Sequence, residues 1–236
     1  MPCRTPLLLL PVALFLGSTA SAGLIQINPG LELQTAWLPD VLGESPGQFS
    51  DEALETIHGS LADSGIETDG YVTMLGLDTD HGIALAFLID APGDPNGTTN
   101  SSLSFQSTAP PNRAAWINDA ASDVTGLING GSGNQVAYGL FTWNAMLEGD
   151  AFAWTGLQLN DEINALFAVV EASTFPGLRA SDTFRFLSAG EDGWFVAHSA
   201  SFTSAGLFGF SAQVVPTPGA LLLLAISGVH VRRRRN

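Results

Sequence analysis

Apolar and polar positions change over short distances along most of this chain, and glycine, asparagine, aspartate and proline separate the apolar runs. Short runs rich in Val, Ile, Phe, Trp and Thr are typical of β-strands, and the separating residues are typical of turns. Many short strands with frequent glycine predict an all-β fold, an antiparallel β-sandwich of jelly-roll or Ig-like type with one short helix. Strands are expected near Leu24–Asn28, Tyr71–Leu77, Ile83–Ile89, Ser102–Ser107, Gln135–Trp143, Ala151–Gln158, Ile163–Glu171, Thr183–Leu187, Trp194–His198 and Leu207–Val214.

The stretch from Tyr71 to Ile89 is apolar enough to suggest a membrane helix, but Asp78, Asp80 and His81 in its middle would be costly in lipid. A hairpin that turns at residues 78–82 is the better interpretation, because Asp side chains cap the backbone of tight turns. The continuous apolar run Ala84–Ile89 predicts a strand that is covered on both faces.

One helix is expected between Ser50 and Gly65. Ser50 is a good N-cap, and the two acidic residues after it lie at the positive end of the helix dipole. Phe49 and Leu54 are placed to form a hydrophobic staple, and Gly65 can end the helix in a left-handed conformation. The helix should pack across one end or face of the sandwich through residues spaced i, i+3 and i+7: Leu54, Ile57 and Leu61.

Two further segments are expected to be exposed loops, Ala91–Ser101 and Gly126–Asn134. Glycine and proline are frequent in the first, and glycine in the second. These residues interrupt strands, so neither segment is expected to continue a neighbouring strand.

The N-terminus has the three parts of a secretory signal peptide, which is expected to span residues 1–22. Arg4 supplies the positive start, and Leu7–Leu16 is the apolar segment. The small residues Ala20 and Ala22 form the cleavage site before Gly23. A buried N-terminal helix is the alternative, which the prolines near this end disfavour.

The C-terminus also has three parts, a Pro-containing turn, an apolar run and a basic end. The apolar run Gly219–Val231 is shorter than the ~20 residues of a usual membrane span, and it approaches that length when extended back to Val214. The arginines should stay on the cytoplasmic side, so that the rest of the protein lies outside the inner membrane.

Val215, Pro216, Thr217 and Pro218 precede the apolar run, and Arg232, Arg233, Arg234 and Arg235 follow it. This layout resembles the PEP-CTERM sorting signal of exopolysaccharide-producing Gram-negative and related bacteria. The resemblance covers residues 215–236, with Thr217 where the family usually has Glu. It implies an exosortase-type membrane enzyme as partner, which processes the tail and transfers the protein to the cell surface. A plain single-helix anchor is the alternative.

Between the two ends, residues 23–214 are enough for one domain, called the mature body below. It contains all 23 acidic residues and only Arg113, Arg179 and Arg185 as basic residues, which gives a formal charge of −20. Such a surface repels phosphate backbones, so nucleic-acid binding is excluded as a function. The single cysteine, Cys3, leaves with the signal peptide, which excludes thiol catalysis and thiolate metal sites.

A calcium site is the best candidate for metal chemistry. The open end of the predicted hairpin, about 20 Å from its turn by strand rise, collects several carboxylates and an amide. Ca²⁺ takes six to eight oxygen ligands of this kind, although the spacing matches no EF-hand loop. A solvated acidic loop is the alternative. The candidate ligands are Glu67, Asp69, Asp90, Asp94 and Asn96.

Glycan binding is a second candidate, because stacked aromatic side chains hold sugars in many sandwiches. Trp37 and Trp116 lie near predicted loops and are the expected exposed tryptophans. Trp143, Trp154 and Trp194 lie in strand contexts with apolar neighbours, which favours core packing.

No residue set has a catalytic signature, and the protein is not expected to be an enzyme. His58 lies in the predicted helix and His198 near a strand end, but no nucleophile elbow is present. A pair of carboxylates for glycoside hydrolysis remains open.

The sequence therefore predicts an exported, acidic protein with a structural or adhesive role in extracellular polysaccharide or at the cell surface. Before processing, its C-terminal helix is expected to hold it transiently at the inner membrane. Apart from the candidate Ca²⁺ ion, no cofactor is expected. The alternatives are a carbohydrate- or calcium-dependent binding module and, third, a secreted hydrolase.

Overall fold

The computed structural model describes most of the mature body and the start of the C-terminal tail. Ala20 and Ala22 of the predicted cleavage site, the tail from Pro218 onward and the four C-terminal arginines lie outside the described residues. The described residues are 23–28, 30–38, 41–42, 47–48, 50–89, 101–117, 124–129, 133–143, 150–169, 178–179 and 181–217.

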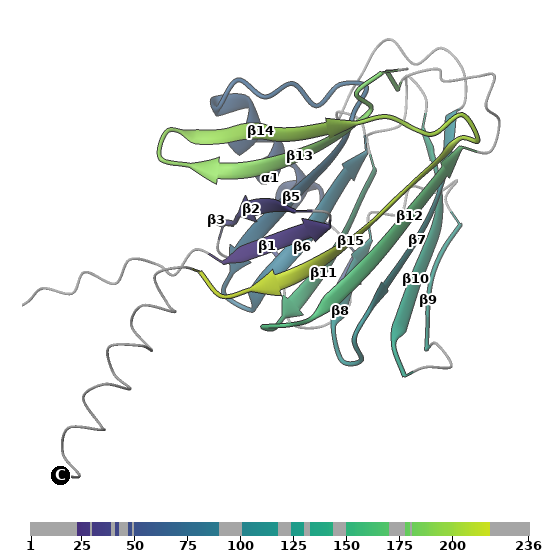
Figure 1. Cartoon of the computed structure of the whole chain (residues 1–236), viewed down its shortest axis with the longest axis horizontal. Coiled ribbons are helices and arrows are strands. Elements are labelled where there is room, and N and C mark those ends of the chain that lie inside the picture. Colours follow the sequence, from purple (N-terminus) through teal and green to yellow (C-terminus); the bar gives the residue numbers. More distant parts are fainter. Residues whose placement is uncertain are drawn as a thin grey trace, which may run out of the picture.

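These residues form two β-sheets and one helix (Figure 1). The seven-stranded sheet has the order β2 (Leu31–Gln34), β1 (Leu24–Asn28), β15 (Leu207–Val215), β12 (Glu162–Val169), β7 (Ser101–Ala109), β10 (Gln135–Trp143) and β9 (Val124–Asn129). The eight-stranded sheet has the order β14 (Gly193–Ala200), β13 (Phe184–Gly190), β5 (Val72–Thr79), β6 (Gly82–Ile89), β11 (Asp150–Leu157), β8 (Ala114–Ile117) and β4 (Gly47–Gln48), with β3 (Ala36–Trp37) beside β5.

Most neighbouring strands are antiparallel, as the sequence predicts, but β5 pairs with both β13 and β3 in parallel, and β4 pairs with β8 in parallel. A parallel pair needs a long connection between its strands, and β13 follows β5 only after the chain has passed through the other sheet. The fold is therefore mostly β and rich in antiparallel pairs.

The first hydrophobic core lies between the two sheets and is dominated by phenylalanine. Phe105 from the seven-stranded sheet and Phe152 from the eight-stranded sheet have ring centroids 4.7 Å apart, and Phe87 lies 5.5 Å from Phe105. Aromatic pairs at such distances and tilted angles add about 0.5–1.5 kcal/mol each beyond the burial of their area. Alternate residues of the long central strands supply this core, which fixes the register of both sheets.

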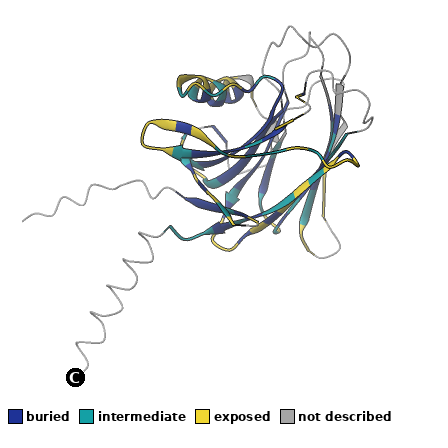
Figure 2. Ribbon diagram, turned by 45° about the horizontal axis from the view of Figure 1, so that its top comes forward, coloured by how far each residue is buried: buried dark blue, intermediate teal, exposed yellow. Residues whose placement is uncertain are grey.

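A second core lies on the outer face of the eight-stranded sheet, under the helix α1 (Asp51–Asp63). Leu54, Ile57 and Leu61 of α1 are all buried there, as their spacing predicts. Strand β6 sends Leu85 and Phe87 into the first core and its alternate residues into the second. Figure 2 shows dark blue on the central strands and on the lower side of the helix. The prediction that Ala84–Ile89 is covered on both faces is confirmed.

The ends of α1 follow the predicted capping chemistry. The Oγ atom of Ser50 accepts a hydrogen bond from the Ala53 backbone N–H at 3.1 Å. At the other end, Gly65 has a φ of +71° and donates to the Ala62 carbonyl, while Ile66 donates to the Leu61 carbonyl. These two bonds form a Schellman motif, which needs the left-handed conformation that glycine adopts without strain. Phe49, the other half of the predicted staple, lies outside the described residues.

The hairpin of β5 and β6 turns at Asp80 and His81, with Thr79 opposite Gly82, so the predicted turn is confirmed. The Thr79 hydroxyl closes this turn by donating to the Gly82 carbonyl at 2.8 Å. No helix among the described residues is long and apolar enough to cross a membrane.

The predicted loop Gly126–Asn134 is partly wrong, because residues 126–129 belong to β9 and pair with β10. Gly126 lies opposite Tyr138, and a Cβ atom at this position would collide with the tyrosine ring. The glycine therefore permits a close side-chain approach within a strand rather than a loop. Of the predicted loop Ala91–Ser101, Ser101 begins β7 and the rest lies outside the described residues.

Candidate functional site

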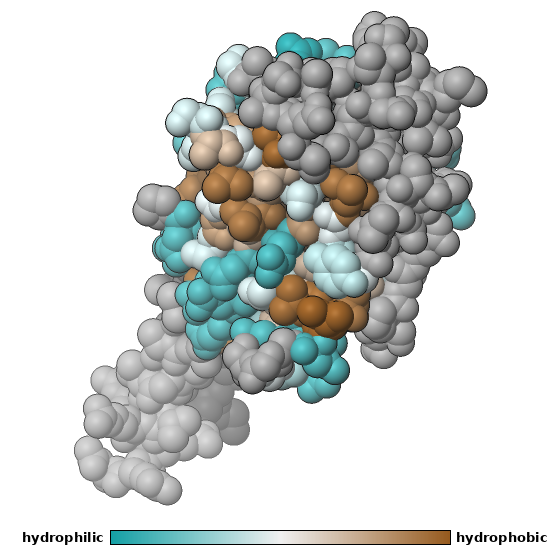
Figure 3. Space-filling model, turned by 90° about the vertical axis from the view of Figure 1, so that its right-hand side faces the viewer, coloured by the Kyte–Doolittle hydropathy of each residue, from teal (hydrophilic) through white to brown (hydrophobic). Residues whose placement is uncertain are grey.

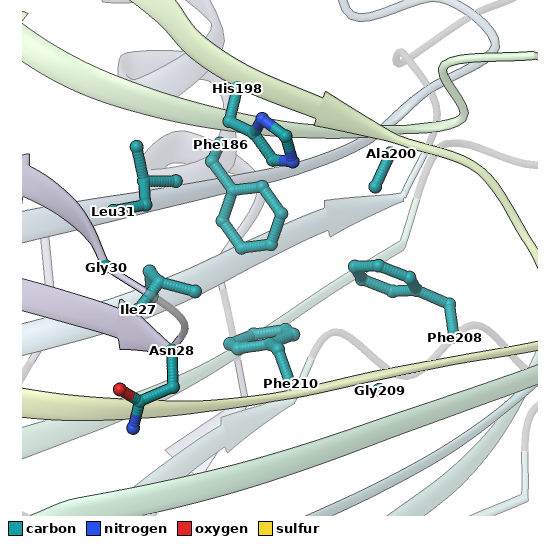
Figure 4. A pocket seen from close by; sticks show the side chains of 10 residues that line it. All are labelled: Ile27, Asn28, Gly30, Leu31, Phe186, His198, Ala200, Phe208, Gly209 and Phe210. Atoms are coloured by element: carbon teal, nitrogen blue, oxygen red, sulfur yellow. The ribbon is translucent and has the colours of Figure 1, made fainter.

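A pocket of about 370 Å³ lies between the two sheets near one edge. Close to it the sheets are held together where the Gln34 backbone N–H of β2 donates to the Ser188 hydroxyl of β13 at 2.9 Å. The seven-stranded sheet and its β1–β2 turn contribute Ile27, Asn28, Gly30, Leu31, Phe208, Gly209 and Phe210 to the pocket, and the eight-stranded sheet contributes Phe186, His198 and Ala200 (Figure 4).

A β-bulge places His198 in this pocket. The pairing of β13 with β14 shifts between Phe186 and Leu187, so that Phe186 is opposite His198 while Leu187 is opposite Val196. The extra residue is Ala197, and after it the side chains of β14 point to the opposite faces of the sheet from those that regular alternation would give. Trp194 on one side of the bulge faces the helix, whereas His198 on the other side faces the pocket. Bulges commonly re-aim side chains near functional sites in this way.

The walls of the pocket are aromatic. The Phe186 and Phe210 rings meet edge to face with centroids 5.2 Å apart, and the His198 ring lies 6.0 Å from Phe186. Phe208 stacks on Phe184 with centroids 3.9 Å apart. Phe208 and Phe210 are only partly buried, so the pocket exposes aromatic surface that the core does not cover.

Of the described lining residues, His198 presents a polar side chain to the pocket, whereas Asn28 does not. The Asn28 side-chain amide donates to the Ser211 hydroxyl at 3.1 Å on the outer face of the seven-stranded sheet, because both residues alternate with the inward-facing Ile27 and Phe210. His198 is exposed and lies on the opposite wall from Asn28 (Figure 4). The described pocket-lining residues include no Asp, Glu, Lys or Arg. The pocket therefore suits a neutral group with an apolar body.

A second feature is the outer face of the seven-stranded sheet, called the open face below. It consists of the outward side chains of β15, β12, β7, β10 and β9, and in the described chain the helix packs on the other sheet instead. The register aligns Gly209, Leu166, Gln106, Tyr138 and Gly126 across the five strands. Five strands at about 4.8 Å spacing make a face about 20 Å wide.

The open face carries almost no charge, although the mature body has a formal charge of −20. These five strands contain Glu162 as their single charged residue. Apart from Glu162, the side chains that the face presents are neutral, and Leu166, Tyr138 and Ile128 are 44%, 42% and 52% exposed. Figure 3 views the side of the molecule where β12, β7 and β10 lie in Figure 1, and it shows brown apolar side chains exposed among white and teal ones.

The predicted calcium ligands are only partly described. Asp90, Asp94 and Asn96 lie outside the described residues. The Glu67 carboxylate forms an ion pair with Arg179 at 3.0 Å, and its backbone carbonyl accepts a hydrogen bond from Arg185 at 2.8 Å.

The two arginines also hold Tyr71. The Arg185 guanidinium lies 3.2 Å from the centroid of the Tyr71 ring, and that of Arg179 lies 4.6 Å away. Two of the three basic residues of the mature body are thus gathered where the sequence predicts only carboxylates, and the cationic guanidinium groups oppose a cation at Glu67. Among the described residues there is no group of three or more His, Cys, Asp or Glu side chains that could hold a metal ion.

The tryptophans divide almost as predicted. Trp37 is 50% exposed, whereas Trp154 and Trp194 are buried in the two cores. The Trp154 indole N–H donates to Ser107 and that of Trp194 to Ser60, both at 2.9 Å. Trp116 was expected to be exposed, but it lies on β8, is partly buried and packs against the second core. The Trp143 side chain lies outside the described residues.

The histidines show no arrangement typical of acid–base catalysis in the described chain. His58 Nδ1 is 3.1 Å from the Thr68 hydroxyl, and burial lowers the pKa of His58 to about 4. A group with this pKa is neutral at physiological pH and a weak base. Ser201, close to His198 in the sequence, accepts a hydrogen bond from the Asp182 backbone N–H.

Sequence reasoning missed the pocket, although a signal was present. Two strands carry a Phe-x-Phe pattern, at residues 184–186 and 208–210, and such alternation places both rings of a pair on one face. What the pattern cannot reveal is the bulge at Ala197, which brings His198 to the same side. No family model, curated protein or solved structure matches this chain.

Proposed function

We propose that this protein is exported and works at the cell surface or in extracellular polysaccharide, where it has a structural or adhesive role. In this proposal the signal peptide directs export and the PEP-CTERM-like tail is processed by an exosortase-type enzyme. The mature body is a two-layer β-sandwich, for which the shared phenylalanine core of the two sheets is the support. The parallel pairing of β5 with β13 departs from an all-antiparallel jelly-roll or Ig-like order.

The observation that carries the adhesive role is the open face, a nearly uncharged surface on a strongly acidic protein. An acidic body repels anionic polymers, and repulsion between its copies keeps it soluble. The open face has Ser, Thr, Gln and Asn side chains that can both donate and accept hydrogen bonds, next to exposed Leu and Tyr side chains. This mixture suits the hydroxyl groups and apolar ring faces of a neutral polysaccharide.

The test is retention of the protein on matrix polysaccharide purified from the native cells. Gln106→Glu puts a negative charge at the centre of the open face with almost no change in shape. We expect retention to fall about tenfold, because a desolvated carboxylate without a partner costs at least about 1.4 kcal/mol.

Ala62→Glu is the matched control, since it adds the same charge at an exposed position of α1, on the other sheet. Equal retention of the two variants would contradict a role of the open face. Retention that is lost in chelator would instead support the calcium-dependent alternative, and turnover of the polysaccharide would support the hydrolase.

A further inference from the structure

We propose that the pocket between β1, β13, β14 and β15 binds a neutral small molecule that has one ring-sized apolar body and a hydrogen-bonding group. This goes beyond the proposed adhesive role, because the pocket and the open face are separate surfaces. The pocket opens between the two sheets, whereas the open face is formed by outward side chains of one sheet.

The volume and lining set the size and polarity of the ligand. Pockets for small molecules begin at about 300 Å³ and are lined mainly by apolar and aromatic side chains. This pocket, at about 370 Å³, lies at the small end of that range, and the rings of Phe186, Phe208 and Phe210 line it. An unfilled apolar pocket forfeits dispersion contacts along its walls, and an apolar ring would restore them.

His198 sets the polar part of the ligand. The Asn28 side chain bonds to Ser211 on the outer face of the seven-stranded sheet, so it supplies no polar group to a ligand in the pocket. His198, on the opposite wall, offers a ring nitrogen at the pocket. One polar side chain is enough to hydrogen-bond one hydroxyl or amide but too few to satisfy the many hydroxyl groups of a buried sugar.

The electrostatics argue against an anionic ligand. The described lining has no lysine or arginine to pair with an anion and no carboxylate to pair with a cation. The formal charge of −20 on the mature body adds a repulsion toward anions. A carboxylate placed among the three phenylalanine rings would lose its hydration without gaining a partner.

The experiment compares three probes on the purified full chain by ligand-observed saturation-transfer NMR: p-cresol, benzoate and methyl β-D-glucoside. We expect p-cresol to bind with a Kd of about 1 mM, the affinity typical of a ligand with so few atoms. Benzoate and the glucoside should bind at least tenfold more weakly. In the labelled protein, p-cresol should shift the resonances of Ala200, Phe208 and Phe210.

Two variants separate the pocket from other exposed aromatic surface. Ala200→Trp fills the pocket from β14 and should weaken p-cresol at least tenfold, with an unchanged circular dichroism spectrum as the check of folding. Phe195→Ala removes a half-exposed ring on the same strand outside the pocket and should leave binding unchanged. If Ala200→Trp perturbs the fold, Phe210→Ala replaces it and should weaken p-cresol by removing a wall.

Three results would overturn the proposal. The first is no binding of p-cresol at concentrations several times the expected Kd. The second is p-cresol-induced resonance shifts that fall only on residues outside the pocket. The third is tighter binding of the glucoside than of p-cresol, which would make this a site for glycan ends. Each differs from a failure of polysaccharide retention, because Gln106→Glu leaves the pocket residues untouched.

Discussion

Replacing His58 with Asn should remove a large part of the acid sensitivity of the fold. His58 lies in α1 and is largely buried, with its Nδ1 atom hydrogen-bonded to Thr68. Asn has an amide group close to the position of Nδ1, so it can keep this hydrogen bond without an ionisable ring. The variant therefore changes the titration more than the packing.

The magnitude follows from the pKa of His58, which burial lowers from 6.5 to about 4. Between these two values the unfolded chain binds a proton that the folded protein does not, so stability falls as the pH falls. Above about pH 6.5 the full stability is present, and by pH 4 the loss approaches 3 kcal/mol, at about 1.4 kcal/mol per pKa unit. That is a substantial share of the 5–15 kcal/mol of a typical domain.

The assay is urea unfolding of the wild-type chain and His58→Asn at several pH values from 4 to 8. The free-energy difference between the two proteins should move by about 3 kcal/mol in favour of the variant as the pH falls across the window. A difference that stays constant with pH would refute the reasoning, because it would mean that His58 titrates equally in both states.

Three further changes test the packing and the electrostatics. The Asp161 carboxylate binds the Arg113 guanidinium through both oxygens, so Asp161→Asn leaves this cation without its counter-charge and should destabilise the fold by about 3 kcal/mol. Glu162→Gln, at the exposed neighbouring position, is the control and should change the midpoint of urea unfolding little. Trp194→Phe should lower the free energy of unfolding by about 1–3 kcal/mol, because it removes the hydrogen bond to Ser60 and part of the second core. Trp37→Phe, at a half-exposed site, is the control and should leave urea unfolding unchanged. Burial raises the pKa of Asp78, so Asp78→Asn should stabilise the protein at neutral pH, where the folded protein holds a partly buried charge. This gain in unfolding free energy should disappear below pH 3.8, the ordinary pKa of Asp, and a gain that grows on acidification would contradict the prediction.

The long strands and the helix could be predicted from the sequence because each carries a local signal. Leu54, Ile57 and Leu61 mark the buried face of α1, and Ser50 and Gly65 mark its ends. The strands β1 and β10 have the predicted bounds, since apolar runs and turn residues define both of their ends.

Other strands escaped prediction because tertiary pairing rather than local pattern makes them strands. β3 and β4 have two residues each and exist through their parallel partners β5 and β8. β9 looked like a loop because of its glycine, whose role becomes visible only when Tyr138 lies opposite.

The candidate sites were harder to predict than the fold. Charge alone grouped Glu67 with other carboxylates, but the chain brings Arg179 and Arg185 to it from more than a hundred positions away. The open face depends on which sheet the helix covers, and the pocket depends on a single-residue bulge. No periodic pattern or motif in the sequence marks the Glu67 contacts, the open face or the bulge.

The most direct test of an exported surface protein is the intact mass and the location of the mature protein in its native cells. The account predicts a surface protein whose mass begins at Gly23 and ends near residues 216–218, with or without a covalent adduct. A protein held in the inner membrane with a mass that runs through Asn236 would contradict the processed sorting signal. A protein inside the cell that retains residues 1–22 would contradict export itself, and with it the adhesive role.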